Sequence, residues 1–274
     1  MLPLALDLEH GAGAPRRDRV MTTLRTPGHD VELAVGWLRS EGVIGDAADV
    51  HAAAPCATAA SAGQDVLRVR LRPGVRVDLA RTVRIGTITA ACGACGRPDD
   101  ASIAAGGDPA TTSTALDGPA FSLAALLAAP DRMLEAQPGF RHSGGLHAAA
   151  LVAPDGRILV VREDVGRHNA VDKVIGAWMG IEATEGRRNG DLATPPPMFA
   201  DVALLVSSRA GYEIVQKATG VGIRVVAAVG AASSLAIDAA TAAGITLAGF
   251  VRESRCSVYA HAEGLDAAGA STRR

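Results

Sequence analysis

Aromatic residues, excess charge and long apolar runs are all scarce in this sequence. Only 3% of its 274 residues are aromatic while 48% are hydrophobic, so a core has to be packed mainly from small and aliphatic side chains. A formal net charge of −2 argues against a protein that binds nucleic acid over its whole surface, which requires a strong basic excess. A local basic site for one small anion remains compatible with this balance.

Two further absences bear on location. No run of about 18 apolar residues occurs, so we expect no membrane-spanning helix. The first twenty residues lack a charged start followed by a long apolar stretch, so we expect no secretory signal. These features predict a cytoplasmic protein with reduced thiols. At this length the four cysteines do not form a disulfide framework; they are Cys56, Cys92, Cys95 and Cys256.

The first third of the chain predicts one helix and two strands. Residues 26–44 have helical spacing after a turn at Pro27-Gly28, with Asp30 as a possible N-cap and an apolar face formed by Leu33, Trp37 and Leu38. Residues 65–74 alternate as a half-exposed strand does, and residues 81–90 predict a weaker strand.

Residues 98–120 are rich in Gly, Pro, Ser, Thr and Asp, which is typical of a connection between domains. We place the boundary there, with a small N-terminal domain at 1–118 and a second domain at 119–274.

The second domain alternates between helices and strands. It begins with a helix at 122–137 that Ser122 can cap, followed by a hairpin at 147–164 around Asp155-Gly156. Three helices and three strands then alternate. The helices are predicted at 166–180, with Val171, Val174, Ile175 and Trp178 inward, at 211–220, ended by Gly220, and at 233–244, ended by Gly244. The strands are predicted at 201–208, 223–230 and 245–252. This order predicts an α/β fold with helices on the faces of a sheet and parallel crossovers.

The segment "CGACG" holds Cys92 and Cys95 three positions apart and admits three chemistries. A structural zinc site needs four ligands, and the chain has a single CxxC, although His142, His147 and His168 could add to it in the fold. A thioredoxin-like pair needs a helix start, which Gly93, Gly96 and Pro98 oppose. Sulfur carriage needs an accessible thiolate on a mobile loop, which the flanking glycines favour.

Six blocks resemble the FdhD/NarQ family of formate dehydrogenase accessory sulfurtransferases. In chain order they are "LAVGWLRSEGVI", "CGACG", "SGGLHAAAL", "REDVGRHNAVDKVIG", "SSRAGYEIVQKA" and "SSLAIDAATAAGITLAGFVR", and the resemblance runs from about residue 20 to 264. The sequence departs from the family pattern at Cys256-Ser257 and at Ala210 to Glu213.

The resemblance implies a cytidine-deaminase-like C-terminal domain, a smaller N-terminal α/β domain and a homodimer. It also implies sulfur transfer from a cysteine desulfurase, through Cys92 and Cys95, to the bis-molybdopterin guanine dinucleotide form of the molybdenum cofactor. The loaded cofactor then enters the catalytic subunit of formate dehydrogenase. No permanently bound cofactor or metal is expected. A non-catalytic carrier or insertion chaperone for the same cofactor is the alternative.

A zinc deaminase is excluded by the residues, although the implied fold is related to that class. Deamination needs His-x-Glu followed by Pro-Cys-x-x-Cys. His147 is followed by Ala148 and Ala149, and the CxxC precedes the histidine in the chain.

Two segments are candidate binding sites for the polyanionic cofactor. Ser207, Ser208 and Arg209 join a buried strand to a helix, where backbone N–H groups at 210–212 could face a phosphate. The segment Phe250, Val251, Arg252, Glu253, Ser254 and Arg255 closes the last strand, with an aromatic ring for guanine and two guanidinium groups for phosphates. In the charged block 162–173, the resemblance assigns His168 to a binding site or a dimer interface.

Overall fold

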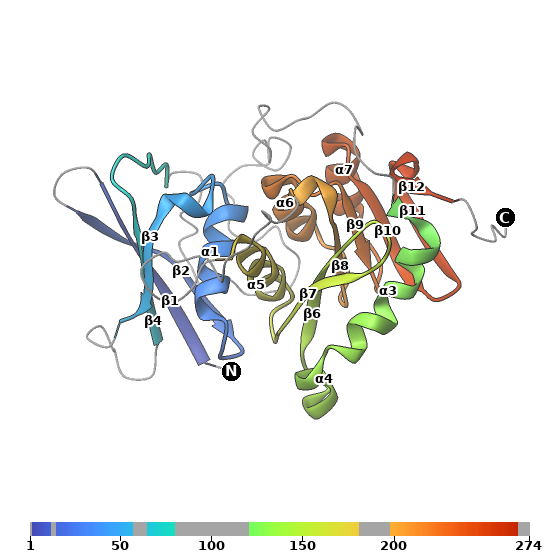
Figure 1. The fold of residues 1–274 in the computed structure, drawn as a ribbon, viewed down its shortest axis with the longest axis horizontal. Helices are drawn as coiled ribbons and strands as arrows, with labels where there is room; N and C mark the ends of the chain where they lie inside the picture. Colours follow the sequence, from blue (N-terminus) through green and yellow to red (C-terminus); the bar gives the residue numbers. More distant parts are fainter. Residues whose placement is uncertain (1, 12–14, 57–64, 80–120, 181–197, 268–274) are drawn as a thin grey trace.

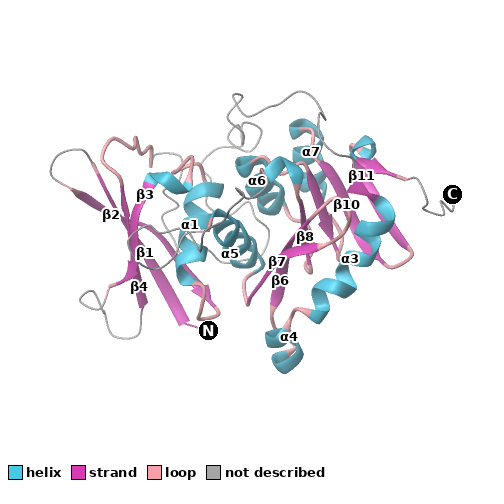
Figure 2. Ribbon diagram, in the orientation of Figure 1, coloured by secondary structure: helices cyan, strands magenta, loops and turns pink. Residues whose placement is uncertain are grey.

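The computed structural model describes residues 2–11, 15–56, 65–79, 121–180 and 198–267. These residues form successive layers, which are seen edge-on in Figure 1. A four-stranded sheet comes first and helix α1 lies against it. Helix α5 lies against α1 and covers a six-stranded sheet, and helix α3 covers the other face of that sheet (Figure 2).

The N-terminal layer is a mixed sheet in the order β2-β1-β4-β3, with α1 (Asp30–Ser40) on one face. Strand β1 pairs in parallel with β4 and antiparallel with β2. The strands are β1 (Leu2–His10), β2 (Arg16–Arg25), β3 (Val50–Pro55) and β4 (Asp65–Leu71). Of these, the sequence pattern predicted only β4, because β1 is buried continuously from Leu4 to Glu9 and shows no alternation of exposure.

The predicted face of α1 is confirmed, but its predicted cap is wrong. Leu33, Trp37 and Leu38 are all buried against the sheet. The N-cap is His29, in a left-handed conformation with φ of 58°, and Asp30 is the first residue of the helix. The Asp30 carboxylate instead accepts two hydrogen bonds from Arg25, at 2.9 and 2.8 Å, which ties the helix start to the end of β2.

The second sheet has the order β11-β10-β9-β8-β6-β7, and its three central strands β10, β9 and β8 are parallel. This confirms the predicted α/β class and the parallel crossovers, which run through α6 and α7. The elements are β5 (Phe121–Ser122), α3 (Leu123–Glu135), α4 (Pro138–Ser143), β6 (His147–Val152), β7 (Ile158–Asp164), α5 (Arg167–Met179), β8 (Ala203–Val206), α6 (Tyr212–Val221), β9 (Val225–Ala228), α7 (Ser234–Ala243), β10 (Thr246–Arg252), β11 (Arg255–Ala260) and β12 (Leu265–Asp266), with short 3-10 turns at Ala47–Asp49, Phe199–Asp201 and Ala262–Gly264.

Period-two alternation along these strands produces two apolar faces. Ala149 and Leu151 of β6 point to the layer of α5, α6 and α7, while Ala148, Ala150 and Val152 point to α3. The α3 face is rich in alanine, also at Ala203, Ala227 and Ala248, so the helix can lie close to the sheet, with Phe121 as the buried aromatic residue of this cluster.

Several local predictions in this half are confirmed. Ser122 caps α3 by accepting a hydrogen bond from the backbone N–H of Ala125 at 3.3 Å. The 147–164 hairpin forms around Gly156, which has φ of +81°. Helix α6, however, does not end at Gly220; it continues to Val221 and Gly222 is its left-handed C-cap. Gly220 is needed elsewhere, because a Cβ there would lie 2.4 Å from the carbonyl oxygen of Ser40.

The two halves meet where α1 crosses α5 with their backbones in contact. A Cβ on Gly36 would lie 1.8 Å from the carbonyl oxygen of Asp172, and one on Gly176 would lie 1.9 Å from that of Glu32. Only glycine permits this approach. The expected domain boundary at 118/119 and the predicted strand at 81–90 lie outside the described residues.

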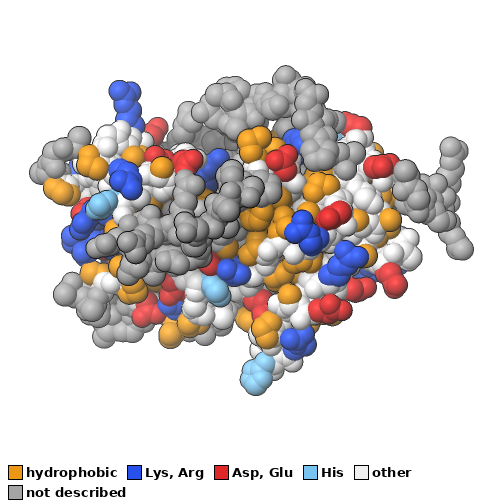
Figure 3. Space-filling model, in the orientation of Figure 1, with side chains coloured by type: hydrophobic (Ala, Val, Ile, Leu, Met, Phe, Trp, Pro, Cys, Tyr) orange, Lys and Arg blue, Asp and Glu red, His pale blue; other side chains and the backbone are white. Residues whose placement is uncertain are grey.

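Among the described residues in the view of Figure 3, Arg side chains are interspersed with Asp and Glu side chains. This agrees with the net charge of −2, and the described residues of that face form no broad basic patch. Among the described helices, none combines the length and apolar character needed to cross a membrane.

Candidate functional site

A cleft of about 790 Å³ opens at the carboxyl ends of the parallel strands. Ser207 follows β8, Val229 follows β9, and Val251 and Arg252 end β10, so consecutive strands deliver their ends to one edge of the sheet. His147 joins them because β6 is antiparallel to β8 and begins where β8 ends. Ligands of open α/β sheets bind in such crevices, and this volume is typical of a small-molecule site.

The opposite wall comes from α3, α4 and the turn that follows them. This wall is mainly apolar, with a few polar groups; its residues are Pro130, Asp131, Met133, Leu134, Gln137, Phe140, Gly144, Gly145 and Leu146. Gly144 is the left-handed cap of α4, with φ of 64°, which turns the chain sharply from the helix toward His147. The sequence pattern did not predict this wall, although the block "SGGLHAAAL" contains Gly144, Gly145 and His147.

His147 is half-buried in the cleft, where Arg167 and His168 act on it electrostatically. Burial, then the charge of Arg167 and that of His168, lower the pKa of His147 below its ordinary value of 6.5. Its imidazole is therefore neutral at neutral pH, with one ring nitrogen able to donate a hydrogen bond and the other able to accept one. This combination suits the polar edge of a base or a proton-transfer step.

His168 itself lies behind the cleft rather than on its surface. It is 7% exposed in the first turn of α5, and its Nε2 lies 2.8 Å from Glu213 Oε2 of α6. The contact is not an aligned hydrogen bond, so its strength depends on the charge of the ring. His168 is therefore not among the residues that line the cleft.

The hydroxyl groups of the serines predicted as phosphate ligands form hydrogen bonds within the protein. Ser207 Oγ accepts a hydrogen bond from the backbone N–H of Ala148 at 2.8 Å, and its hydroxyl hydrogen remains available to the cleft. Ser208 Oγ donates to the carbonyl oxygen of Arg209 at 3.1 Å. The backbone N–H of Ala210, predicted to be free, donates to the carbonyl oxygen of Ala231 at 3.0 Å, so that part of the prediction is wrong.

The second predicted binding segment, 250–255, comprises the end of β10, the two-residue turn at 253–254 and the first residue of β11. The register of the two strands shifts between Gly249 and Arg252, and Phe250 adopts a left-handed conformation with φ of 52° in that irregularity. Phe250 is 43% exposed and its backbone N–H donates to the carbonyl oxygen of Gly230. Val251 is buried, whereas the four residues that follow it are exposed at the rim.

The structure thus brings together four of the predicted binding residues. Ser207, Val251, Arg252 and Glu253 line the cleft. Ser208, Arg209, Phe250, Ser254 and Arg255 are near these in sequence but are not among its lining residues. Cys92 and Cys95 lie outside the described residues.

The other two cysteines have separate surroundings. Cys56 follows β3 and its Sγ accepts a hydrogen bond from Arg68 at 2.9 Å. Cys256 is half-buried on β11, where burial raises the pKa of its thiol and so disfavours the reactive thiolate. Across the part of the chain that the structure describes, no three His, Cys, Asp or Glu side chains are placed to hold a metal ion.

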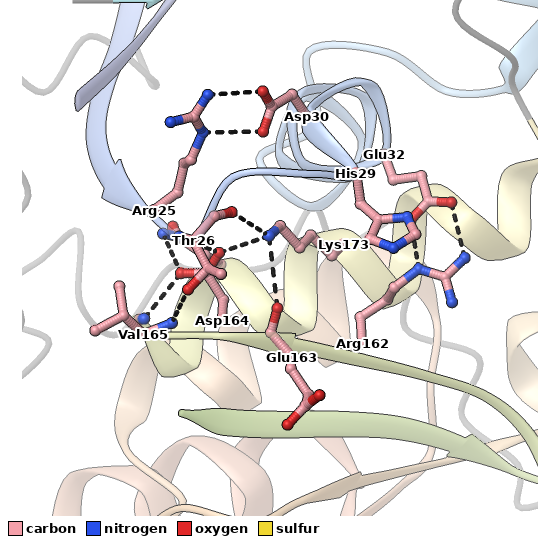
Figure 4. Close-up of polar contacts among 12 residues, drawn as sticks. Arg25, Thr26, His29, Asp30, Glu32, Arg162, Glu163, Asp164, Val165 and Lys173 are labelled. Carbon is pink, nitrogen blue, oxygen red and sulfur yellow. Dashed lines mark hydrogen bonds and ion pairs between the residues drawn. The ribbon is translucent and has the colours of Figure 1, made fainter. Parts of the chain in front are cut away.

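The charged block 162–173 is an internal interface rather than a solvated face. Asp164 and Lys173 are 0% and 1% exposed in their side chains, and their charged atoms are 2.7 Å apart. Lys173 also donates to the carbonyl oxygen of Thr26, and Asn169 donates to that of Leu24. Figure 4 shows this cluster between the end of β2 and the start of α5. These residues join the two halves of one chain.

A second buried ion pair involves Asp172, the residue before Lys173. Asp172 Oδ1 is 2.8 Å from Lys217 Nζ of α6 and accepts a hydrogen bond from Ser40 of α1 at 2.9 Å. Burial raises the pKa of Asp172, and the ammonium group of Lys217 opposes that rise. Lys173 and Lys217 are the two lysines of the whole sequence, and both are committed to this interface.

With this geometry in view, comparison with known proteins identifies the class. The sequence matches the FdhD/NarQ family over residues 16–266, and the chain belongs to that family.

Two relatives from different organisms carry the same name. The chain is 43% identical over 256 residues to the sulfur carrier protein FdhD of Anaeromyxobacter dehalogenans strain 2CP-1, covering 92% of this chain and 85% of the relative. It is 46% identical over 248 residues to the protein of that name from Mycolicibacterium paratuberculosis, covering 89% and 85%. A solved structure of a candidate formate dehydrogenase accessory protein from Desulfotalea psychrophila shares the fold, with a TM-score of 0.63, 20% identity and coverage of 96% and 88%.

Proposed function

We propose that this protein is a sulfurtransferase that carries persulfide sulfur from a cysteine desulfurase to the bis-molybdopterin guanine dinucleotide cofactor, which formate dehydrogenase requires. The observation that carries the proposal is the CGACG pair, Cys92 and Cys95, in a chain more than 40% identical to proteins named as sulfur carriers over most of its length. The half-buried Cys256, whose thiol has a raised pKa, is a weaker candidate nucleophile.

The sulfur steps use two thiols. The Cys92 thiolate attacks the outer sulfur of the donor's persulfide, the S–S bond of the donor breaks, and the donor's cysteine leaves as a thiolate. Cys92 now bears the persulfide. Cys95 then either stabilises it or attacks the inner sulfur, which forms a Cys92–Cys95 disulfide and releases the outer sulfur as hydrosulfide.

The cleft supports binding of one nucleotide arm of the cofactor, which is cargo rather than a resident group. Arg252 at the rim can meet a phosphate, while His147 and the hydroxyl of Ser207 can bond the edge of a base. The apolar wall with Phe140 and Leu146 can cover its face. We assign Phe250, Arg209 and Arg255 to parts of the cofactor outside the cleft.

The proposal carries the remaining expectations of the family. Residues 119–274 adopt a cytidine-deaminase-like fold, the protein acts in the cytoplasm as a homodimer, and its partners are a cysteine desulfurase and the catalytic subunit of formate dehydrogenase. The alternative is a carrier or insertion chaperone that holds the cofactor without transferring sulfur.

Complementation tests the proposal in cells that lack their own FdhD. Wild-type protein should restore formate dehydrogenase activity, and Cys92→Ala should abolish it because no nucleophile receives the sulfur. Cys95→Ala should retain part of it. Cys256→Ala is the matched control and should restore activity fully. An active Cys92→Ala strain would rule out sulfur carriage through this residue.

A further inference from the structure

Strand β7 ends in three consecutive charged residues whose side chains reach different parts of the molecule. Because side chains alternate along a strand, Arg162 and Asp164 lie on one face and Glu163 on the other. Arg162 donates to the Glu32 carboxylate of α1 at 2.5 and 2.8 Å. Asp164 pairs with Lys173 and accepts from the backbone N–H of Thr26 at 3.0 Å. Figure 4 shows the Glu163 carboxylate pointing away from this group.

The Glu163 carboxylate instead holds helix α4. One oxygen accepts from the backbone N–H of Gly139 at 2.8 Å and the other accepts from that of Phe140 at 2.6 Å. These N–H groups lie in the first turn of α4, where a helix offers no internal acceptor. The helix has six residues and none of them is buried, so it has little apolar packing to fix its position.

Gly139 allows this close approach. A Cβ on Gly139 would lie 2.7 Å from a methyl carbon of Leu146 and 3.0 Å from the Glu163 carboxylate. The first turn of α4 is therefore pressed between Glu163 and Leu146. Both Phe140 and Leu146 line the cleft, as do Gly144 and Gly145 between them. The position of α4 consequently sets the distance between this wall and the strand ends.

We propose that Glu163 is a positioning residue for the cleft, fixing the α4 wall against β7. Because Arg162 and Asp164 anchor the same strand end to α1 and to the end of β2, this wall is also held in a fixed relation to the N-terminal layer. The inference rests on the proposed function only for the identity of the cleft's ligand. Loss of Glu163 should weaken ligand binding while leaving the folded core intact.

The test compares Glu163→Ala with Glu163→Gln and a matched control, Glu135→Ala. Glu135 is an exposed glutamate at the end of α3, so its loss changes the net charge equally. Amide hydrogen exchange at Gly139 and Phe140 should speed up by at least about tenfold in Glu163→Ala, because each N–H loses a hydrogen bond to a charged acceptor. Glu163→Gln retains the shape and should show a smaller increase, and the control none. The thermal midpoint should stay near the wild-type value in all three.

Two readouts of the cleft complete the experiment. Calorimetry with GDP should give about tenfold weaker binding for Glu163→Ala and unchanged binding for Glu135→Ala. The methyl signals of Leu146 and Met133 in the NMR spectrum should shift only in the Glu163 variants. If wild-type protein does not bind GDP, the proposed ligand is wrong, and the exchange and methyl data still decide the positioning role. Unchanged exchange, or faster exchange with unmoved methyl signals and unchanged affinity, would overturn the inference.

Discussion

Polar side chains at the α1–α5 interface and at the cleft differ in what surrounds them. Lys173 and Lys217 are buried, and each has a carboxylate and at least one further acceptor within 3.2 Å. Arg252 and Glu253, at the rim of the cleft, are exposed to solvent. Removing a buried charge leaves its partner without water or a counter-ion, whereas removing a rim charge leaves the fold unchanged. The comparison separates residues that hold the two halves together from residues available to a ligand.

The largest effect on stability should come from Lys173→Met. Asp164 would keep its backbone and amide donors but lose the charge that balances it in a fully buried site. We expect the free energy of unfolding to fall by about 3–5 kcal/mol, the usual cost of breaking a buried pair from one side. Urea denaturation measures this loss.

The double variant Lys173→Met with Asp164→Asn serves as the control for Lys173→Met, because it removes both charges and should recover part of the stability. GDP affinity of the folded fraction should be unchanged, because the pair lies on the far face of β7 from the cleft. A loss of stability below about 1 kcal/mol would mean that the Lys173 ammonium group does not compensate the buried charge of Asp164.

An intermediate effect, confined to binding, should follow Arg252→Ala. The loss of one charge-assisted phosphate contact costs roughly 1.5–3 kcal/mol, or about ten- to a hundredfold in GDP affinity. The thermal midpoint should not move. Arg157→Ala is the control, since Arg157 is an exposed residue at the far end of the 147–164 hairpin. Calorimetry with GDP and ADP checks the result, and equal binding of the two would remove guanine recognition from this cleft.

The smallest effect should be a pH dependence at His147. Its pKa is lowered in the folded protein, so below the unfolded value of 6.5 the unfolded chain binds a proton more readily. Its contribution to stability is therefore complete above that pH and is lost as the pH falls through the folded pKa. The difference in unfolding free energy between wild type and His147→Asn should change in this direction on acidification. A difference independent of pH would show that burial, Arg167 and His168 do not lower the pKa of His147.

The second sheet could be predicted from the sequence for physical reasons. The central strands β8, β9 and β10 are buried on both faces, so each is a short apolar run bounded by small residues or glycine, and helical spacing separates them. Strands β1, β2 and β3 could not be predicted with the same means. Their polar side chains, such as Asp7 and Glu9 of β1, are buried against arginines of neighbouring strands, which hides the alternation.

Only the side of the cleft that is lined by the ends of the parallel strands could be predicted from the sequence. Ligands gather at the carboxyl ends of parallel strands, so Ser207 and Arg252 were accessible to sequence reasoning. The wall that contains Phe140 depends on where α4 lies, and that is fixed by Glu163, more than twenty positions away. The charged block was also misleading, because Glu32 and Thr26, the partners of Arg162 and Lys173, lie more than 120 residues upstream.

Intact-mass spectrometry of the purified protein after incubation with a cysteine desulfurase and cysteine tests the central claim most directly. The wild-type chain should gain the mass of one sulfur atom, which a reducing agent removes, because the Cys92 thiolate takes the outer sulfur of the donor's persulfide. Cys92→Ala should gain none, and Cys256→Ala should gain as much as the wild type. A wild-type chain that stays unmodified would contradict sulfur carriage and favour the cofactor chaperone. A Cys92→Ala chain that gains the same sulfur would contradict carriage through Cys92 and assign it to another thiol.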